Sequence, residues 1–131
     1  MSNLKSQIYI SNVKSTNVKV RAYQFSIKII KFVNKLPSKR AFWVIGDQLI
    51  RSATSIGANM MEGQSSSSRR EFIKYYEISL KSSNETKYWL SLLKDSFVEL
   101  KNEIEILLKE NEEISRMIAS SILTLKNKNR Y

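Results

Sequence analysis

Residues 100–125 read LKNEIEILLKENEEISRMIASSILTL and form the longest regular pattern in the chain. One position in every three or four is apolar there, except that the position between Leu108 and Ile114 is Asn111. The apolar positions are Leu100, Ile104, Leu108, Ile114, Ile118, Ile122 and Leu125. This spacing predicts a helix of about seven turns with one buried seam. A buried Asn111 would fix the packing register, whereas a half-exposed Asn111 would have no such role.

Three earlier stretches share this period. The first runs from Asn17 to Leu36, where Pro37 blocks continuation. The second follows Pro37-Ser38 and stops at Gly63, and the third begins at a capping box formed by Ser68 and Glu71. The break before the last helix is placed loosely between residues 95 and 101.

Four helices with short connections predict an all-α, antiparallel up-down-up-down four-helix bundle. Its expected organisation is an N-terminal arm or tail at residues 1–15, the bundle at 16–126 and a basic C-terminal tail at 127–131. A chain of 131 residues is long enough for one core and one domain.

The residue types that usually carry chemistry are scarce. The chain has no His and no Cys, which removes the commonest general base and the thiolate metal ligands. The carboxylates from Glu99 to Glu113 alternate with basic residues, which is typical of a solvated helix face. The loop Gln64–Ser68 lacks the glycines and the lysine of a phosphate-binding loop. We therefore expect no enzyme, no cofactor and no metal site.

The first fifteen residues lack the apolar core of a secretory signal, and no run reaches the roughly 18 apolar residues of a membrane span. The sequence therefore predicts a cytoplasmic protein without a membrane partner.

Positive charge is concentrated in the first half of the chain. The formal net charge is +10; residues 1–70 hold 12 basic and 2 acidic side chains, whereas residues 71–131 hold 10 of each. Such asymmetry favours an anionic partner such as RNA or DNA, although a lysine-rich solvated surface explains it equally well.

A basic stripe is predicted on the first helix. Arg21, Lys28 and Lys35 are seven residues apart with Lys31 between them, and we expect them to share one exposed face. The remaining candidates are Lys39, Arg40 and Arg51 on the second helix and Arg69 and Arg70 at the positive end of the third. Such residues would contact phosphates without reading bases; a solubilising surface is the alternative.

Aromatic residues allow two interpretations. They could stack on bases, or they could be core and subunit-interface residues, the commoner case at helical spacing. Adjacent apolar pairs such as Trp43-Val44 and Trp89-Leu90 indicate more than one buried face and hence an oligomer. The aromatic candidates are Phe42, Trp43, Tyr75, Tyr76, Tyr88 and Trp89.

The stretch QLIRSATSIGANMMEG at residues 48–63, with Glu71-Phe72-Ile73 and Ser83 to Glu85, resembles the four-helix-bundle family encoded within intervening sequences of bacterial 23S ribosomal RNA genes. The resemblance covers about residues 20–125 and implies a homopentamer around a central channel. It also implies kinship with the accessory variability proteins of diversity-generating retroelements, basic pentamers that partner a reverse transcriptase and bind nucleic acid.

In this resemblance the motif residues Asn59, Glu62, Gly63, Phe72 and Glu85 have structural roles. The loop departs from the family pattern, because Gln64 and four serines stand where a basic residue often follows the Glu-Gly pair. Our leading hypothesis is a non-enzymatic oligomeric bundle that binds RNA or DNA electrostatically, as an accessory to a reverse transcriptase or to ribosomal RNA. The alternative is a protein-protein interaction scaffold that does not bind nucleic acid.

Overall fold

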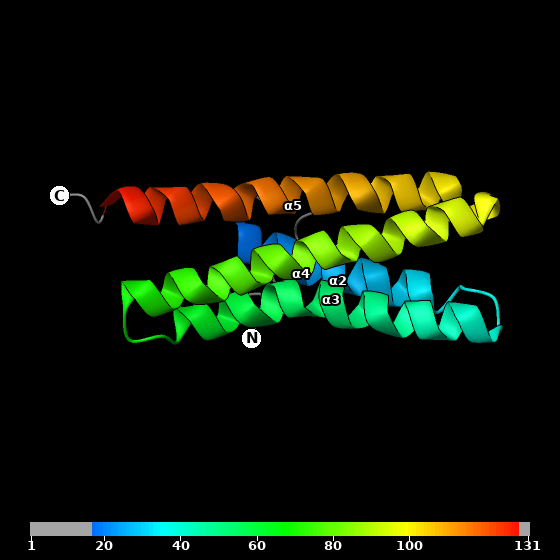
Figure 1. Ribbon diagram of the computed structural model, residues 1–131, viewed down its shortest axis with the longest axis horizontal. Helices are drawn as coiled ribbons and strands as arrows, with labels where there is room; N and C mark the ends of the chain where they lie inside the picture. The colour runs from blue at the N-terminus through cyan, green and yellow to red at the C-terminus, as the bar shows by residue number, and fades with distance from the viewer. Residues whose placement is uncertain (1–16, 129–131) are drawn as a thin grey trace.

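The structure is a computed structural model that describes residues 17–128. This part of the chain forms four α-helices and one short 3-10 helix, without any strand. They are α2 (Val18–Val33), α3 (Arg40–Gln64), α4 (Arg69–Ser96), η1 (Val98–Leu100) and α5 (Lys101–Lys128), shown in Figure 1. The predicted all-α fold with four helices is confirmed. The predicted arm or tail at residues 1–15 lies outside the described residues.

Local signals set both ends of α2. The Asn17 side chain caps its start by accepting from the backbone N–H of Lys19 at 3.0 Å. The helix ends at Val33, three residues before the predicted Leu36. The chain tightens there into i to i+3 turns ahead of Pro37, with Leu36 N–H donating to the Val33 carbonyl at 3.1 Å.

α3 ends at Gln64, one residue after the predicted Gly63, and Gly63 does not adopt the positive φ of a helix-ending glycine. The glycine instead allows α4 to approach: a Cβ built at Gly63 would lie 3.3 Å from the Cβ of Tyr75. Its missing side chain therefore serves helix packing rather than helix termination.

The ends of α4 and α5 match the sequence more closely. The Ser68 hydroxyl accepts from the Glu71 backbone N–H at 3.1 Å, so the Ser68 half of the predicted capping box is present at the start of α4. The expected break falls between Ser96 and Lys101, where η1 lies. At its other end α5 continues to Lys128, which extends the helix into the stretch predicted to be a tail from residue 127.

Contacts within two helix pairs, α2 with α3 and α4 with α5, join the start of one helix to the end of the other. Ala22 near the start of α2 faces Gly57 near the end of α3, whereas Val33 at the end of α2 faces Gly46 near the start of α3. The same reversal holds between α4 and α5, where Glu77 pairs with Lys126 at 3.4 Å. Of these four α-helices, α2 is the shortest, as Figure 1 shows.

The predicted seam of α5 lies in the core. Ile104, Ile114 and Ile118 are fully buried and pack with side chains such as Phe25 and Leu49 from the other helices. Leu107, which the spacing did not mark, is buried as well.

Asn111 is buried, which settles the alternatives left by the sequence. Its Nδ2 donates to the Ser83 carbonyl at 3.0 Å, and its Oδ1 accepts from the Ser83 hydroxyl at 3.0 Å. This double link fixes the register between α4 and α5. Between α3 and α4, Ser79 donates to the Ile56 carbonyl at 2.8 Å, as close helix packing predicts.

Candidate nucleic-acid interface

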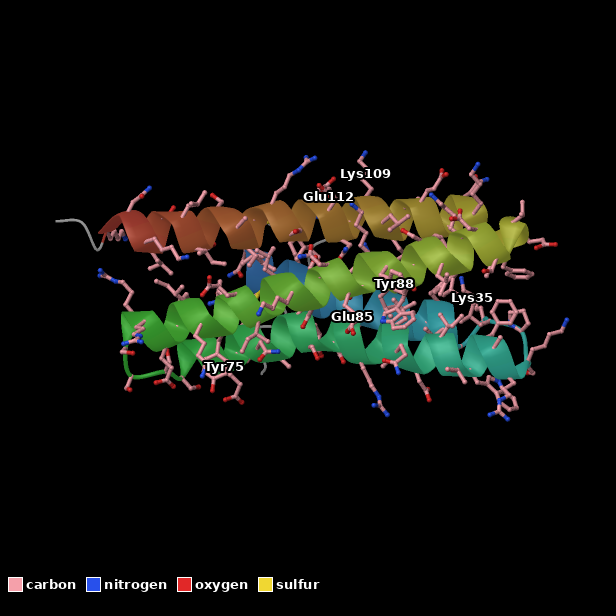
Figure 2. The ribbon with its side chains drawn as sticks, in the orientation of Figure 1. Lys35, Tyr75, Glu85, Tyr88, Lys109 and Glu112 are labelled. Atoms are coloured by element: carbon pink, nitrogen blue, oxygen red, sulfur yellow. The ribbon has the colours of Figure 1, made fainter. Side chains whose placement is uncertain are left out.

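The predicted basic stripe runs along the boundary between α2 and α5. Lys28 and Lys31 are exposed on α2, and Lys35 is exposed just beyond its end. No acidic residue occurs in Val18–Val33, so α2 carries only positive side-chain charge. Figure 2 labels Lys35 near the turn that leads into α3.

Arg21 does not belong to the exposed stripe, which corrects the prediction. It is only 5% exposed. Its Nε donates to Glu110 Oε2 at 2.9 Å, and its Nη2 lies 2.8 Å from both Glu110 Oε1 and Glu113 Oε1. Heptad spacing placed Arg21 in one row with Lys28 and Lys35, but this end of the row is covered by α5.

The carboxylates around Arg21 decide its electrostatics. The hydrogen bond with Glu110 is the main cause that raises the pKa of Arg21 above its ordinary value; the bond with Glu113 adds to it, and burial opposes both. The guanidinium therefore stays charged, and its donors are occupied within the protein. Glu110 is buried with it, so the predicted fully solvated acidic face is wrong at this position.

From Lys28 onward the same row borders an open groove between α2 and α5. The groove has a volume of about 280 Å³. Phe32 and Leu107 are buried at its base, and Ile106, 68% exposed, stands on the α5 side. It is lined by Lys28, Lys31, Phe32, Lys35, Glu103, Ile106 and Leu107.

One of the three lysines has a partner. Lys35 forms an ion pair with Glu103 across the groove, between two side chains that both remain partly exposed. No described carboxylate lies within ion-pair distance of Lys28 or Lys31. The ammonium groups of Lys28 and Lys31 can therefore bind an external anion directly. Lys35 would have to release Glu103 before it could bind one.

The other predicted cations lie on separate surfaces. Lys39 and Arg40 are exposed at the start of α3, near the Lys35 end of the bundle, and Arg51 is exposed midway along α3. Arg69 and Arg70 begin α4 and are also exposed, but they lie at the opposite end of the bundle (Figure 1). The structure therefore gathers Lys28, Lys31 and Lys35 and disperses the rest.

Comparison with known proteins places most of the chain in one family. The family model described as 23S rRNA-intervening sequence protein matches residues 14–120. The chain belongs to this family.

A solved relative has the same fold as this family member. It is a protein of unknown function from the S23 ribosomal protein family of Bacteroides thetaiotaomicron VPI-5482. The two chains are 34% identical and superpose with a TM-score of 0.76, covering 81% of this chain and 98% of the other. Among proteins of curated function, none matches this sequence. Neither the family nor the relative bears the name of an enzyme.

The motif residues of the 23S rRNA-intervening sequence family divide into two groups. Phe72 packs against the core and stacks on Tyr76 of the same helix with ring centroids 4.4 Å apart. The Nδ2 of Asn59 donates to the Ser55 carbonyl at 2.8 Å within α3. Glu62 and Glu85 are exposed on the surface, where no described contact gives them a packing role.

None of the six aromatic candidates lines the lysine groove, where the aromatic lining residue is Phe32, buried at the base. Tyr76 is buried, and Trp89, Tyr75 and Phe42 are partly buried. Trp43 and Tyr88 are 63% and 59% exposed on α3 and α4. The interpretation as core or interface residues therefore holds better within the described chain than the interpretation as a stacking platform beside the lysines.

The α5 wall of the groove was missed from the sequence. Glu103 and Glu110 are seven residues apart, the same interval that separates Lys28 from Lys35. Matching heptads of opposite charge are a known signal of pairing between adjacent helices. This signal would have paired Lys28 and Lys35 with the two glutamates, whereas the observed pairs are Arg21 with Glu110 and Lys35 with Glu103. The spacing alone therefore could not have given the contacts.

None of the helices in residues 17–128 is long and apolar enough to cross a bilayer. The same residues contain no group of three or more acidic side chains placed to hold a metal ion.

Proposed function

We propose that this chain is a non-enzymatic, self-associating helical bundle that binds nucleic acid electrostatically through Lys28, Lys31 and Lys35. The observation that carries the proposal is the row of three exposed lysines along a helix without acidic residues. Two of them have no carboxylate partner among the described residues. Phosphate contacts of this kind fix a nucleic acid on a surface without reading its sequence.

Family membership supports an RNA partner. The family takes its name from intervening sequences of 23S ribosomal RNA, and its resemblance to accessory variability proteins extends the proposal to a reverse transcriptase partner. The proposed site is smaller than the sequence predicted, because Arg21 is internal and Arg51, Arg69 and Arg70 lie elsewhere on the surface.

Self-association is supported by exposed apolar side chains on α2 and α3. Tyr23 and Ile30 are exposed on α2, and Trp43 and Met61 are exposed on α3. Gly46 and Gly57 face α2. Trp43 lies three residues before Gly46, and Met61 lies four residues after Gly57, so each is on nearly the same side of α3 as its glycine. The apolar side chains thus flank the line where α2 meets α3, and exposed apolar surface of this kind marks interfaces. The resemblance implies five copies.

A double charge reversal tests nucleic-acid binding. Lys28→Glu/Lys31→Glu should weaken binding of a fluorescein-labelled RNA in an anisotropy titration, because two phosphate contacts are lost. The slope of log K against log salt should fall in magnitude by about 1 to 2, at roughly 0.7 per contact with a single strand.

The matched control is Lys81→Glu/Lys87→Glu, which makes the same charge change at exposed lysines of α4. It should retain most of the affinity. Salt-independent binding, or equal losses in the two variants, would contradict the lysine row as the site. Absence of binding at low salt would instead favour the protein scaffold, whose surface would include exposed apolar residues such as Tyr88 and Val98.

A further inference from the structure

The two walls of the lysine groove differ in charge. The α2 wall contributes Lys28, Lys31 and Lys35, whereas the α5 wall contributes the carboxylate of Glu103, which pairs with Lys35. Glu103 lines the groove, and Glu105 is exposed on the same helix one residue before Ile106. Glu110 and Glu113 pair with Arg21, and Glu112 pairs with Arg116. The boundary between positive and negative side chains therefore lies between the α2 lysines and the carboxylates Glu103 and Glu105.

This boundary discriminates between forms of nucleic acid. Packed helix axes lie about 8–10 Å apart. A duplex carries two phosphate rows separated by grooves about 6 and 12 Å wide. A duplex with one row on the α2 lysines would bring its other row over the α5 carboxylates, where like charges repel. A single strand has one row and can stay on the lysine wall.

The apolar side chain opposite the lysines fits the bases of such a strand. Ile106 is 68% exposed and faces the same groove as Lys28 and Lys31. Bases in a duplex are stacked and paired, so their faces cannot reach it. Unpaired bases expose apolar faces, which single-strand sites contact beside a cationic track, usually with aromatic side chains. Here the exposed apolar side chain is the aliphatic Ile106.

We propose that the α2/α5 groove binds single-stranded nucleic acid in preference to duplex, with phosphates along the lysine wall and bases against Ile106. This inference rests on the proposed function and specifies its substrate. Net charge alone would favour the opposite order, because a duplex carries one charge per about 1.7 Å and a single strand one per about 3.4 Å.

The test compares one labelled RNA strand, alone and annealed to its complement, by anisotropy at fixed low salt. The single strand should bind the wild-type protein about tenfold more tightly, a difference of the size expected when a few base contacts are gained. Ile106→Gln should weaken single-strand binding about three- to tenfold, because one apolar side-chain contact is lost, and should leave duplex binding unchanged. Because the side chain is exposed, this variant should keep the wild-type circular dichroism spectrum.

Two variants sharpen the result. Leu123→Gln is the matched control, because Leu123 is 60% exposed on the same helix and does not line the groove; it should change neither affinity. Glu103→Gln/Glu105→Gln removes part of the repelling wall and should raise duplex affinity more than single-strand affinity.

The outcomes separate the two proposals. Duplex binding as tight as single-strand binding, an Ile106→Gln variant without effect, or an unchanged preference in Glu103→Gln/Glu105→Gln would overturn the single-strand inference and leave electrostatic binding intact. Failure of both RNA forms to bind would overturn the proposed function, and the inference with it.

Discussion

The guanidinium of Arg21 is surrounded by groups from one neighbouring helix. Glu110 and Glu113 accept its hydrogen bonds, and Met117 Sδ lies 3.6 Å from Nη1. Charges taken out of water are costly unless they are paired and fully hydrogen-bonded. Glu110 therefore depends on Arg21 for its burial, whereas Glu113, whose side chain is 27% exposed, can still reach water.

Replacing Arg21 alone should be strongly destabilising. In Arg21→Met the Glu110 carboxylate stays buried without its partner, which should lower the free energy of unfolding by about 3–5 kcal/mol. Urea denaturation followed by circular dichroism measures this change.

The double variant Arg21→Met/Glu110→Leu provides the control. It should recover most of the lost stability, because apolar side chains of similar volume replace a buried ion pair at little net cost. Its RNA affinity should equal that of the wild type. A folded double variant with clearly weaker RNA binding would return Arg21 to the binding surface.

Tyr76 should make the protein less stable to unfolding at alkaline pH. Burial raises the pKa of its hydroxyl above the ordinary 10.0, because the phenolate would be poorly solvated. The unfolded chain then releases this proton at lower pH than the folded chain does. Stability from this residue is complete below about pH 10 and is lost as pH rises through the higher folded pKa.

Tyr76→Phe should therefore flatten the fall in unfolding free energy above pH 10. Unfolding curves measured on both sides of that pH test this, with Tyr88→Phe as the control because Tyr88 is 59% exposed. If the two variants lose stability with the same slope as the wild type, burial of Tyr76 has no such effect.

Capping determines where α4 begins. Ser68 satisfies the Glu71 N–H at 3.1 Å, one of the four amides left free at a helix start. Ser68→Ala should cost about 1 kcal/mol of unfolding free energy. The adjacent Ser67→Ala, at an exposed position with no described side-chain bond, should stay within about 0.5 kcal/mol of the wild type. Equal effects would show that loop composition matters rather than the cap.

Helices were predictable because their signals are local. The period of three and four residues, Pro37 and Ser68 each act within a few positions of the chain. The neighbour that a helix face meets is not a local property. Periodicity placed Arg21 in one row with Lys28 and Lys35, but only the position of α5 determines that Arg21 is buried and that the lysines border a groove.

Gly63 illustrates the same limit at the scale of an element. A glycine near a helix end usually indicates a stop, and here it permits contact with Tyr75 on α4. A helix end and a close contact with a second helix both favour glycine. The sequence alone therefore could not separate the two roles.

At the scale of the whole molecule, the exposed apolar side chains beside the α2/α3 contact predict self-association. Size exclusion with light scattering should give a mass several times the 15.2 kDa of one chain. Trp43→Glu should shift the protein toward smaller species, because it places a charge on the proposed interface. Tyr88→Glu makes the same kind of change at an exposed aromatic residue of α4 and should not. A wild-type monomer would contradict the oligomer.

The lysine row beside the α2/α5 groove also makes the electric field uneven across the molecule, because α2 carries four basic and no acidic side chains whereas the charges of α5 balance. Fields of this kind act over about a Debye length, roughly 8 Å at physiological salt, so an approaching polyanion is rotated toward α2 before contact. Such steering acts on the association rate. Ionic strength should thus govern how often a productive encounter occurs, while the contacts at Ile106 govern how long the complex lasts.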